Sequence, residues 1–466
     1  MAAQTRRIQE ELLVYLCDNY TDDNPHLTLT SLKEHLKSIL KDSEVSDRPL
    51  QAERWLYWAQ QNKYIKCIET EVPVGILPDG CNASLIDAKV FSKKRGPDDE
   101  IYDNNDDIRN RVARGNCLLR MGNEVTCIIY ALKKFTGGLG DDDDKTTGGD
   151  DFTWKRYFIK ELNEVELVCA TKKANGEAAH LSCIDVQGEK IICAGSKNVH
   201  LLFKNRSDIE KYVDQRFRIA KEVAQTVSDF LDQMDKEARQ KLLEFLCVTH
   251  FTAVFEILSP AHQHVENLSH LERPMLKFIA WTKTSNLDTN DLCCVVPHIG
   301  FEIGRILKLD TVEYDLIPVS DLDLRMQQVR CGYNSEGEVF YFLDFNSNVV
   351  GLLKKKTVWY IMCRAIREKS KAAVLSKSKK QDFKEKKALG KTKCRILEIR
   401  TWLKLDDDTT SIWQGLAINY IRWCLRNFES SKVSQEEIID KFPDLWKRFL
   451  AENDETDEII AKFINS

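Results

Sequence analysis

Apolar residues recur at two different spacings along the chain, and the changes of spacing divide it into three parts. Up to about residue 70 they recur every three or four positions, as Ile8, Leu12 and Leu16 do, which predicts helices. From about residue 111, short runs of Val, Ile, Phe and Tyr predict an antiparallel sheet assembly, interrupted by a helical block at 208–246. Helical spacing returns from Val358 to the end. The pattern therefore predicts an α+β fold with helical parts before and after a sheet-containing centre.

The same pattern predicts where these parts meet. Residues 75–110 are mostly polar and rich in turn residues, which indicates a linker. Before it, three helices and a strand at 64–74 suit a small winged-helix-like module or another helical cap. We expect a helical accessory domain at 1–95, the central domain at 96–365 and a helical, initially basic domain at 366–466. The expected strands of the central domain are 116–119, 126–130, 166–170, 179–185, 190–194, 200–203, 252–258, 276–281, 313–316, 338–344 and 349–353.

Composition is that of a folded protein without a membrane anchor. The chain has 466 residues, enough for two or three domains, of which 43% are hydrophobic and 30% charged. Its longest apolar runs are only a few residues, so we expect neither a transmembrane helix nor a signal peptide. The 15 cysteines, an odd number without a CxxC pair, indicate neither a disulfide framework nor a zinc site. We therefore expect an intracellular protein, cytoplasmic or nuclear, with no membrane partner.

Charge is spread unevenly along the chain. The net charge of −5 argues, on its own, against a nucleic-acid partner. Residues 364–395, however, hold 13 Lys and Arg against 3 acidic residues, a local balance of +10 that leaves −15 for the rest. Such a run is either a solvated helix face or targeting patch, or a surface that contacts phosphates. Residues 137–151 hold six Asp and five Gly against one Lys, which predicts a flexible loop or an insertion.

The candidate chemistry begins with a lysine between two predicted strands. The turn Lys173–Gly176, with the letters KANG, joins the strand at 166–170 to the strand at 179–185. Its glycine permits a tight turn and a close backbone approach to a phosphate. A lysine amine attacks phosphorus only when deprotonated, which requires neighbouring cations or a dry pocket. Taken alone, such a tetrapeptide is usually an ordinary hairpin turn with a solvated lysine.

Four further segments supply charges suited to nucleotide transfer. Lys354 and Lys356 share one face of a predicted strand because side chains alternate, so both can neutralise charge that develops on a phosphate. Glu336 precedes another strand, where its carboxylate can hold Mg²⁺ against phosphates. The four segments are Ser196-Lys197, Phe255-Glu256-Ile257, Glu336-Gly337 and Lys354-Lys355-Lys356.

In this order the segments resemble the motifs of covalent nucleotidyltransferases, the superfamily of ATP-dependent ligases and capping enzymes. The first motif of that superfamily is K-x-[DN]-G, the fourth is a Glu-Gly before a strand, and the fifth is K-x-K. The detail is similar to the phage RNA ligase 1-type family of ATP-dependent RNA ligases, over about residues 111–365. Residues 252–260 (TAVFEILSP) are similar to its third motif and residues 354–360 (KKKTVWY) to its fifth. Upstream, Ala113-Arg114-Gly115 resembles an A-R-G strand and Lys134-Phe135 part of a K-F-F-N segment, with Lys133 as the alternative to Lys134.

The resemblance implies an antiparallel-sheet nucleotidyltransferase (adenylyltransferase) core and an ATP-dependent RNA ligase. Such an enzyme joins 5′-phosphate and 3′-hydroxyl RNA ends in RNA repair or processing, with or without end-processing enzymes in trans. By resemblance, Lys173 attacks ATP to form lysyl–AMP, Lys354 and Lys356 stabilise the α-phosphate, and Glu336 binds Mg²⁺ or Mn²⁺. The nucleotide-binding residues implied are Arg114, Lys134, Asn175, Gly176, Lys197, Phe255, Glu256 and Gly337.

Three alternatives stay open. A DNA ligase or an mRNA guanylyltransferase shares three of these motifs, but it carries an OB-fold after the fifth motif, where this sequence predicts helices. A catalytically inactive, ligase-derived RNA-binding protein is the second alternative, although Lys173 and Glu336 are both present. Finally, Trp359 and Tyr360 can equally pack in the core or stack on a base. The particular RNA and the oligomeric state do not follow from the sequence.

Overall fold

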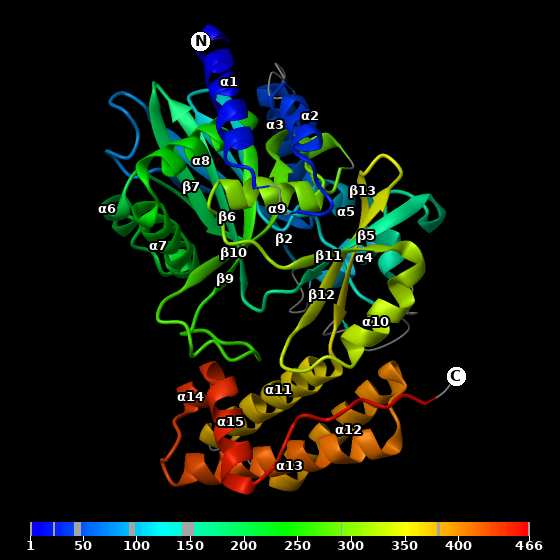
Figure 1. The fold of residues 1–466 in the computed structure, drawn as a ribbon. Coiled ribbons are helices and arrows are strands. Elements are labelled where there is room, and N and C mark those ends of the chain that lie inside the picture. Colours follow the sequence, from blue (N-terminus) through cyan, green and yellow to red (C-terminus); the bar gives the residue numbers. More distant parts are fainter. Residues whose placement is uncertain are drawn as a thin grey trace.

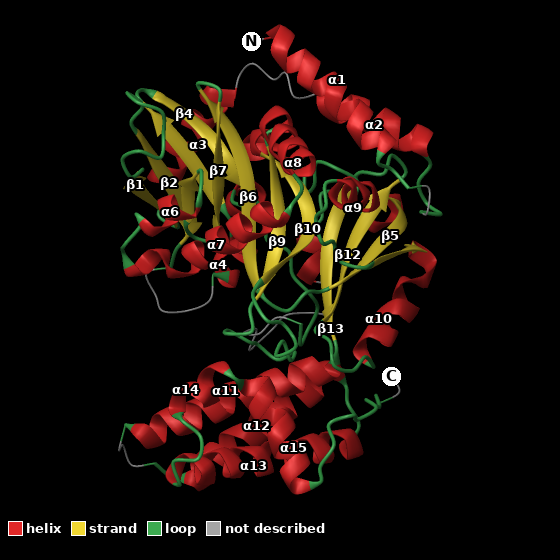
Figure 2. Cartoon of the chain, turned by 60° about the vertical axis from the view of Figure 1, so that its left-hand side comes forward, coloured by secondary structure: helices red, strands yellow, loops and turns green. Residues whose placement is uncertain are grey.

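Three antiparallel sheets, the helices that cover them and a helical bundle below them make up the protein (Figures 1 and 2). The computed structural model describes residues 2–21, 24–41, 48–92, 98–141, 153–289, 291–379 and 383–464. Within these residues the strand orders of the sheets are β1-β2-β3-β4, β10-β9-β6-β7-β8 and β11-β5-β12-β13. The predicted α+β class is confirmed.

The strands form where apolar residues alternate or run together. In the second sheet, Leu181 pairs with Ala194 on one side and Ala253 on the other, and all three side chains are fully buried. The strands are β1 (Ile65–Glu71), β2 (Ala83–Val90), β3 (Asn116–Met121), β4 (Glu124–Tyr130), β5 (Val165–Lys172), β6 (Glu177–Val186), β7 (Glu189–Ser196), β8 (His200–Phe203), β9 (Phe251–Leu258), β10 (Met275–Lys283), β11 (Tyr314–Pro318), β12 (Gly337–Asp344) and β13 (Val349–Lys356).

The N-terminal helices belong to two different packing groups. Helices α1 (Ala2–Asp18) and α2 (Leu29–Lys41) bury Leu12 and Leu36 in the same hydrophobic core as the second sheet, whereas α3 (Arg48–Gln61) buries Trp55 against the first sheet. The predicted linker at 75–110 is wrong, because β2 pairs with β3 and the short helices α4 (Asp99–Asn104) and α5 (Asp106–Arg111) follow it. Strands from both sides of the predicted boundary at residue 95 therefore share one sheet.

Helices cover one face of the second sheet. The helical block predicted at 208–246 divides into α6 (Arg206–Glu210), α7 (Arg218–Gln233) and α8 (Lys236–Thr249). The division falls at Asp235, whose side chain accepts the Ala238 N–H at 2.8 Å as the N-cap of α8. Helices α7 and α8 pack on β7 and β6, and α9 (Pro297–Ile306) packs on β10. Helix α10 (Leu322–Arg330) lies beside β12 and β13.

The C-terminal helices form a bundle with a hydrophobic core of its own. Thr357, directly after β13, caps the first of them by accepting the Tyr360 N–H at 3.0 Å, so the bundle begins where the third sheet ends (Figure 1). The helices are α11 (Val358–Ser378), α12 (Glu385–Leu403), α13 (Asp407–Glu429), α14 (Gln435–Asp440) and α15 (Phe442–Asn453). Among the described helices of the whole chain, none combines the length and apolarity needed to cross a membrane.

Candidate active site

A pocket of about 220 Å³ lies between the second and third sheets, beside the segment that follows β4. Apolar side chains such as Leu132, Val254 and Ile279 form part of its wall, next to several cations. The predicted site residues that line it are Arg114, Lys134, Lys173, Phe255, Glu256 and Lys354. Chain segments far apart in the sequence therefore meet around one cavity.

Lys173 lies at the end of β5, where its amine faces a carboxylate. Its backbone N–H donates to the Gly337 carbonyl at 2.8 Å. Its Nζ lies 3.2 Å from Oε1 of Glu336, and Lys356 Nζ lies 3.6 Å from the same oxygen. Burial alone would lower the pKa of Lys173, but the negative charges of Glu336 and Glu256 outweigh burial and raise it. The amine is therefore protonated in the free protein.

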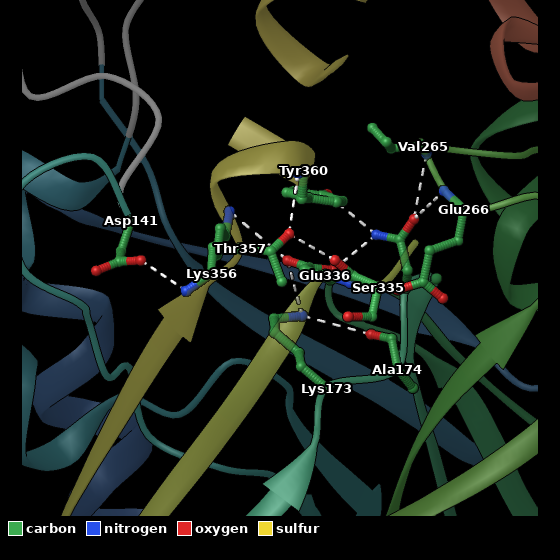
Figure 3. A network of polar contacts seen from close by, with 12 residues as sticks. Asp141, Lys173, Ala174, Val265, Glu266, Ser335, Glu336, Lys356, Thr357 and Tyr360 are labelled. Carbon is green, nitrogen blue, oxygen red and sulfur yellow. Dashed lines mark hydrogen bonds and ion pairs between the residues drawn. The ribbon is translucent and has the colours of Figure 1, made fainter. Parts of the chain in front are cut away.

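A closed network of polar contacts holds Glu336 in place (Figure 3). The side-chain amide of Asn175 donates to Oε2 of Glu336 at 2.6 Å and to the hydroxyl of Tyr360 at 3.0 Å. Its oxygen accepts the N–H groups of Val265 and Glu266, both at 3.2 Å. Because both donated bonds need the NH₂ group, asparagine and aspartate are not equivalent at position 175. We call Lys173, Asn175, Glu336 and Lys356 the Lys173 centre.

Glu336 has the chemistry expected of a divalent-cation ligand. Burial would raise its pKa, but Lys173, Lys356 and the Asn175 amide together hold it below the ordinary value, so the carboxylate is ionised. Mg²⁺ is commonly held by one or two carboxylates and completed by substrate phosphates and water. Glu336 is therefore of the ligand type that Mg²⁺ and Mn²⁺ take, while its two oxygens are engaged by Lys173, Lys356 and the Asn175 amide.

The strand that carries Lys354 and Lys356 is held by the segment predicted to be a flexible acidic loop. Asp141 is fully buried, and its Oδ1 accepts the Lys356 N–H at 2.7 Å. The two oxygens of Asp141 also accept bonds from Arg330 at 2.6 and 2.8 Å. Slightly upstream, the Thr136 carbonyl accepts the Lys354 N–H at 3.2 Å. The prediction of a flexible loop is therefore wrong at Asp141, and residues 142–152 lie outside the described residues.

Three predicted cations meet two carboxylates at the start of α4. Nη1 of Arg114 lies 3.0 and 3.1 Å from the two oxygens of Asp98, and Lys197 Nζ lies 2.8 Å from Oδ2. Lys134 forms an ion pair with Asp99. Burial would raise the pKa of Asp98, but the neighbouring cations lower it to about 2. We call these five residues the cation cluster.

The structure distinguishes Lys134 from its neighbour Lys133, the alternative in the sequence. Lys133 donates from Nζ to the Thr289 carbonyl at 2.7 Å, and burial lowers its pKa to about 8. Its side chain is therefore occupied outside the cation cluster. Lys134, through Asp99, lies in the cluster that also contains Arg114.

Phe255 and Glu256 lie on β9 in the pocket wall. Phe255 is 1% exposed and packs edge-on against Phe278, with ring centroids 5.6 Å apart. Oε1 of Glu256 accepts the Gly176 N–H at 3.2 Å. Burial raises the pKa of Glu256 to about 7, and the nearby Lys173 only partly opposes this. Glu256 is thus partly protonated at neutral pH, whereas Glu336 is ionised.

Two glycines among the predicted residues allow strands to approach closely. A Cβ on Gly176 would lie 2.1 Å from the Ile257 carbonyl oxygen. The glycine therefore allows the backbone of this turn to pack closely against β9. Gly337 begins β12 at φ +131°, and a Cβ there would lie 2.1 Å from the Lys355 carbonyl oxygen. Gly337 lines a neighbouring polar cleft rather than the pocket itself.

Trp359 and Tyr360 pack instead of presenting a free aromatic face. They are 6% and 3% exposed and belong to the core of the bundle. Trp359 donates from its indole to Asp457 at 2.7 Å, while the Tyr360 hydroxyl accepts the Asn175 bond.

Sequence reasoning missed Glu266, whose carboxylate accepts the Glu336 N–H, because no local motif marks it.

Metal-ligand residue types also meet directly behind the pocket lining, next to His180. In the described part of the chain, one group of ligand atoms lies within 4.8 Å of one another: Asp87, Cys117 and His200, all buried. His200 is already hydrogen-bonded through both ring nitrogens, to Asp87 at 2.7 Å and to His180 at 3.0 Å. These bonds satisfy the imidazole and account for the cluster without a metal ion.

Taken together, the fold and the site define an α+β protein with a lysine–carboxylate pair beside a pocket rich in cations. The chain belongs to the family described as Domain of unknown function (DUF7920), whose model matches residues 79–367. That match includes every predicted site residue from Arg114 to Lys356.

Two further comparisons complete this picture. No curated protein matches the sequence. Among solved structures, a mutant RNA ligase of Naegleria gruberi, determined with ATP and Mn, is similar at 12% identity and a TM-score of 0.26, over 64% of this chain and 97% of that chain. A TM-score this low does not establish a shared fold.

Proposed function

We propose that the protein is an ATP-dependent RNA ligase that joins 5′-phosphate and 3′-hydroxyl RNA ends through a lysyl–AMP intermediate. The observation that carries the proposal is the placement of Lys173. Its amine lies at a pocket wall, 3.2 Å from a buried carboxylate that Lys356 approaches to 3.6 Å. A lysine amine at a pocket wall, a buried ionised carboxylate beside it and further cations close by are what transfer of a nucleotidyl group to lysine requires.

In the proposed first step, the Lys173 amine attacks the α-phosphorus of ATP. The Lys173 ammonium group first gives one proton to solvent. The nitrogen–phosphorus bond then forms, the bond to pyrophosphate breaks, and the nitrogen gives a second proton to solvent. Lys354 and Lys356 stabilise the negative charge on the α-phosphate oxygens. A divalent cation at Glu336 would supply positive charge that lowers the pKa of Lys173. Phe255 and Glu256 are the proposed contacts for base and ribose.

In the later steps, AMP moves to a 5′-phosphate RNA end, and the 3′-hydroxyl of another end displaces it. The support for RNA is the basic segment that follows the pocket directly in the chain. Burial lowers the pKa of His264 to about 4. The positive charges of Arg367 and, to a smaller extent, Lys173 contribute to this lowering. Arg367, near the middle of α11, and Lys173 therefore both act on His264. The exposed lysines of this basic segment, which can contact phosphates, are Lys379, Lys384, Lys386, Lys387, Lys391 and Lys393.

The alternatives fit the structure less well. After β13, the described residues form helices and no further strand, in contrast to the OB-fold expected of a DNA ligase or guanylyltransferase. An inactive RNA-binding descendant has no need for the Asn175 amide that holds Glu336 ionised beside Lys173.

Labelling with α-³²P nucleotides tests the proposal. Wild-type protein incubated with Mg²⁺ and labelled ATP should retain label on a denaturing gel, and labelled GTP should give none. Lys173→Ala should abolish the label, whereas the matched control Lys190→Ala, which removes a lysine paired with Asp185 on the other side of the second sheet, should retain it. Absence of label with wild-type protein, or label from GTP alone, would overturn the proposal. Ligation of 5′-phosphate, 3′-hydroxyl RNA against equivalent DNA then tests the substrate.

A further inference from the structure

The cation cluster consists of three cationic side chains and two carboxylates that partly neutralise them. Arg114 and Lys134 line the pocket, and Lys197 lies beside Arg114 on the same Asp98 carboxylate. Asp98 and Asp99 together contact all three cations. Two carboxylates from adjacent residues present several oxygens to these cations, much as a diphosphate would. The cluster in this state is therefore neutralised to a formal charge of +1.

The Asp98 carboxylate contacts the cations and not the helix end at which Asp98 lies. Asp98 is the N-cap residue of α4, yet its side chain accepts no hydrogen bond from the helix N-terminus. It contacts Arg114 and Lys197 instead. The helix itself is fixed further along by Ile101 and Tyr102, which are 8% and 1% exposed. The carboxylates can therefore leave the cations by side-chain rotation while α4 stays in place.

Exposure makes such an exchange of partners feasible. The side chains of Arg114, Asp98 and Lys197 are 30%, 23% and 33% exposed, so water and dissolved anions reach them. Partly exposed ion pairs of this kind contribute little net stability because solvent screens them. A phosphate chain, with more negative charge than one carboxylate, competes well for the same donors.

We propose that Asp98 and Asp99 occupy the phosphate-binding positions of the cation cluster in the nucleotide-free protein and compete there with the phosphates of the bound nucleotide. The identity of that nucleotide rests on the proposed function. Binding of the triphosphate displaces the two carboxylates, and their return after the first step displaces pyrophosphate. The carboxylates thereby weaken the binding of pyrophosphate and oppose the reversal of nucleotidyl transfer.

Titration calorimetry with inorganic pyrophosphate at fixed Mg²⁺ and low salt tests the proposal. The double variant Asp98→Asn/Asp99→Asn should bind pyrophosphate about tenfold more tightly than wild type, because its asparagines keep the shape but lose the competing charge. The matched control is Asp229→Asn/Asp232→Asn on α7, which also removes two carboxylates paired with arginines. This control should change the affinity by no more than about twofold. The single variants Asp98→Asn and Asp99→Asn should each give a smaller gain.

The outcomes separate this proposal from the proposed function. Equal or weaker binding of pyrophosphate by the folded double variant, or by both folded single variants, would overturn competition. Weaker binding would mean that the carboxylates hold Arg114 and Lys197 in the positions that bind phosphate. A wild type that takes no label from ATP contradicts the ligase function, yet tighter pyrophosphate binding by the variant would still support competition at the cluster. In a labelled enzyme, added pyrophosphate should remove the label faster from the double variant than from wild type.

Discussion

The Lys173 centre and the cation cluster use the same ingredients in different ways. Each places lysine or arginine beside a carboxylate whose pKa is held below its ordinary value. Glu336 is 5% exposed and is fixed by the Asn175 amide as well as by two ammonium groups. The Asp98 side chain is 23% exposed, and its partners among the described residues are the charged groups of Arg114 and Lys197. A buried network with directional neutral donors keeps a single arrangement, whereas a partly exposed set of ion pairs can exchange its anion.

The largest effect is expected from Asn175→Asp, which tests whether the Lys173 centre depends on a neutral donor. The introduced carboxylate would lie where the amide now donates to Glu336 at 2.6 Å. Two buried carboxylates at that distance cannot both be ionised. We expect a loss of about 3–5 kcal/mol in the free energy of unfolding near neutral pH, measured by urea denaturation. The adenylylation of Lys173 that we propose should fall about a hundredfold or more.

The pH dependence of this loss identifies its cause. The carboxyl pair would have a raised pKa in the folded state, so its penalty should grow as the pH rises and shrink toward acid pH. The matched control is Asn163→Asp at an exposed position, with an expected change below about 0.5 kcal/mol. Nearly unchanged stability and labelling in Asn175→Asp would mean that the amide is not what fixes Glu336.

A smaller effect of opposite sign is expected from Glu256→Gln. The pKa of this carboxyl is about 7 in the folded protein against an ordinary 4.5, so the folded chain binds more protons between these values. Wild-type stability therefore falls as the pH rises from 4.5 to 7, and this loss is absent from the glutamine variant. The variant should gain up to about 3 kcal/mol relative to wild type above pH 7, and the gain should vanish near pH 4.5.

Urea denaturation at several pH values measures this difference. Glutamine keeps an acceptor for the Gly176 N–H, so the comparison isolates the charge. Glu53→Gln, at an exposed position on α3, is the matched control and should change stability by less than about 0.5 kcal/mol throughout. A stability difference between the Glu256→Gln variant and wild type that does not depend on pH would contradict the raised pKa.

The contrast between the two regions also explains what the sequence could predict. The strands that carry Glu256 and Lys354, and the strand that ends just before Lys173, follow from alternating apolar residues. The resemblance of the motifs to those of one enzyme family predicts these three residues around one pocket, and all three line it. The partners of Asn175 could not be predicted, because Glu336 and Tyr360 are 161 and 185 residues away in the chain. Local composition carries no information about such contacts.

Local composition was misleading where polar residues are buried. Asp141 belongs to an acidic, glycine-rich run, yet its carboxylate is buried against Arg330, 189 residues away. In β2, Ser84 and Asp87 interrupt the apolar pattern and made the segment resemble a linker, although Glu69 and His200 satisfy both inside the protein. Burial of a polar side chain depends on a distant partner, and this is why hydropathy predicted the strands of the pocket but not β2.

The smallest effect is expected in the cation cluster, from the stability of Asp98→Asn. The pKa of Asp98 is about 2 in the folded protein against an ordinary 3.8, so its contribution is present above pH 3.8 and disappears as the pH falls through 2. Because Arg114 and Lys197 are about one-third exposed, we expect a loss of only about 1 kcal/mol at neutral pH, measured by urea denaturation. The loss should be screened by added salt, unlike the loss in Asn175→Asp. A cost above about 3 kcal/mol would instead make the cluster as rigid as the Lys173 centre, and its carboxylates would then be too tightly held to give way to phosphate.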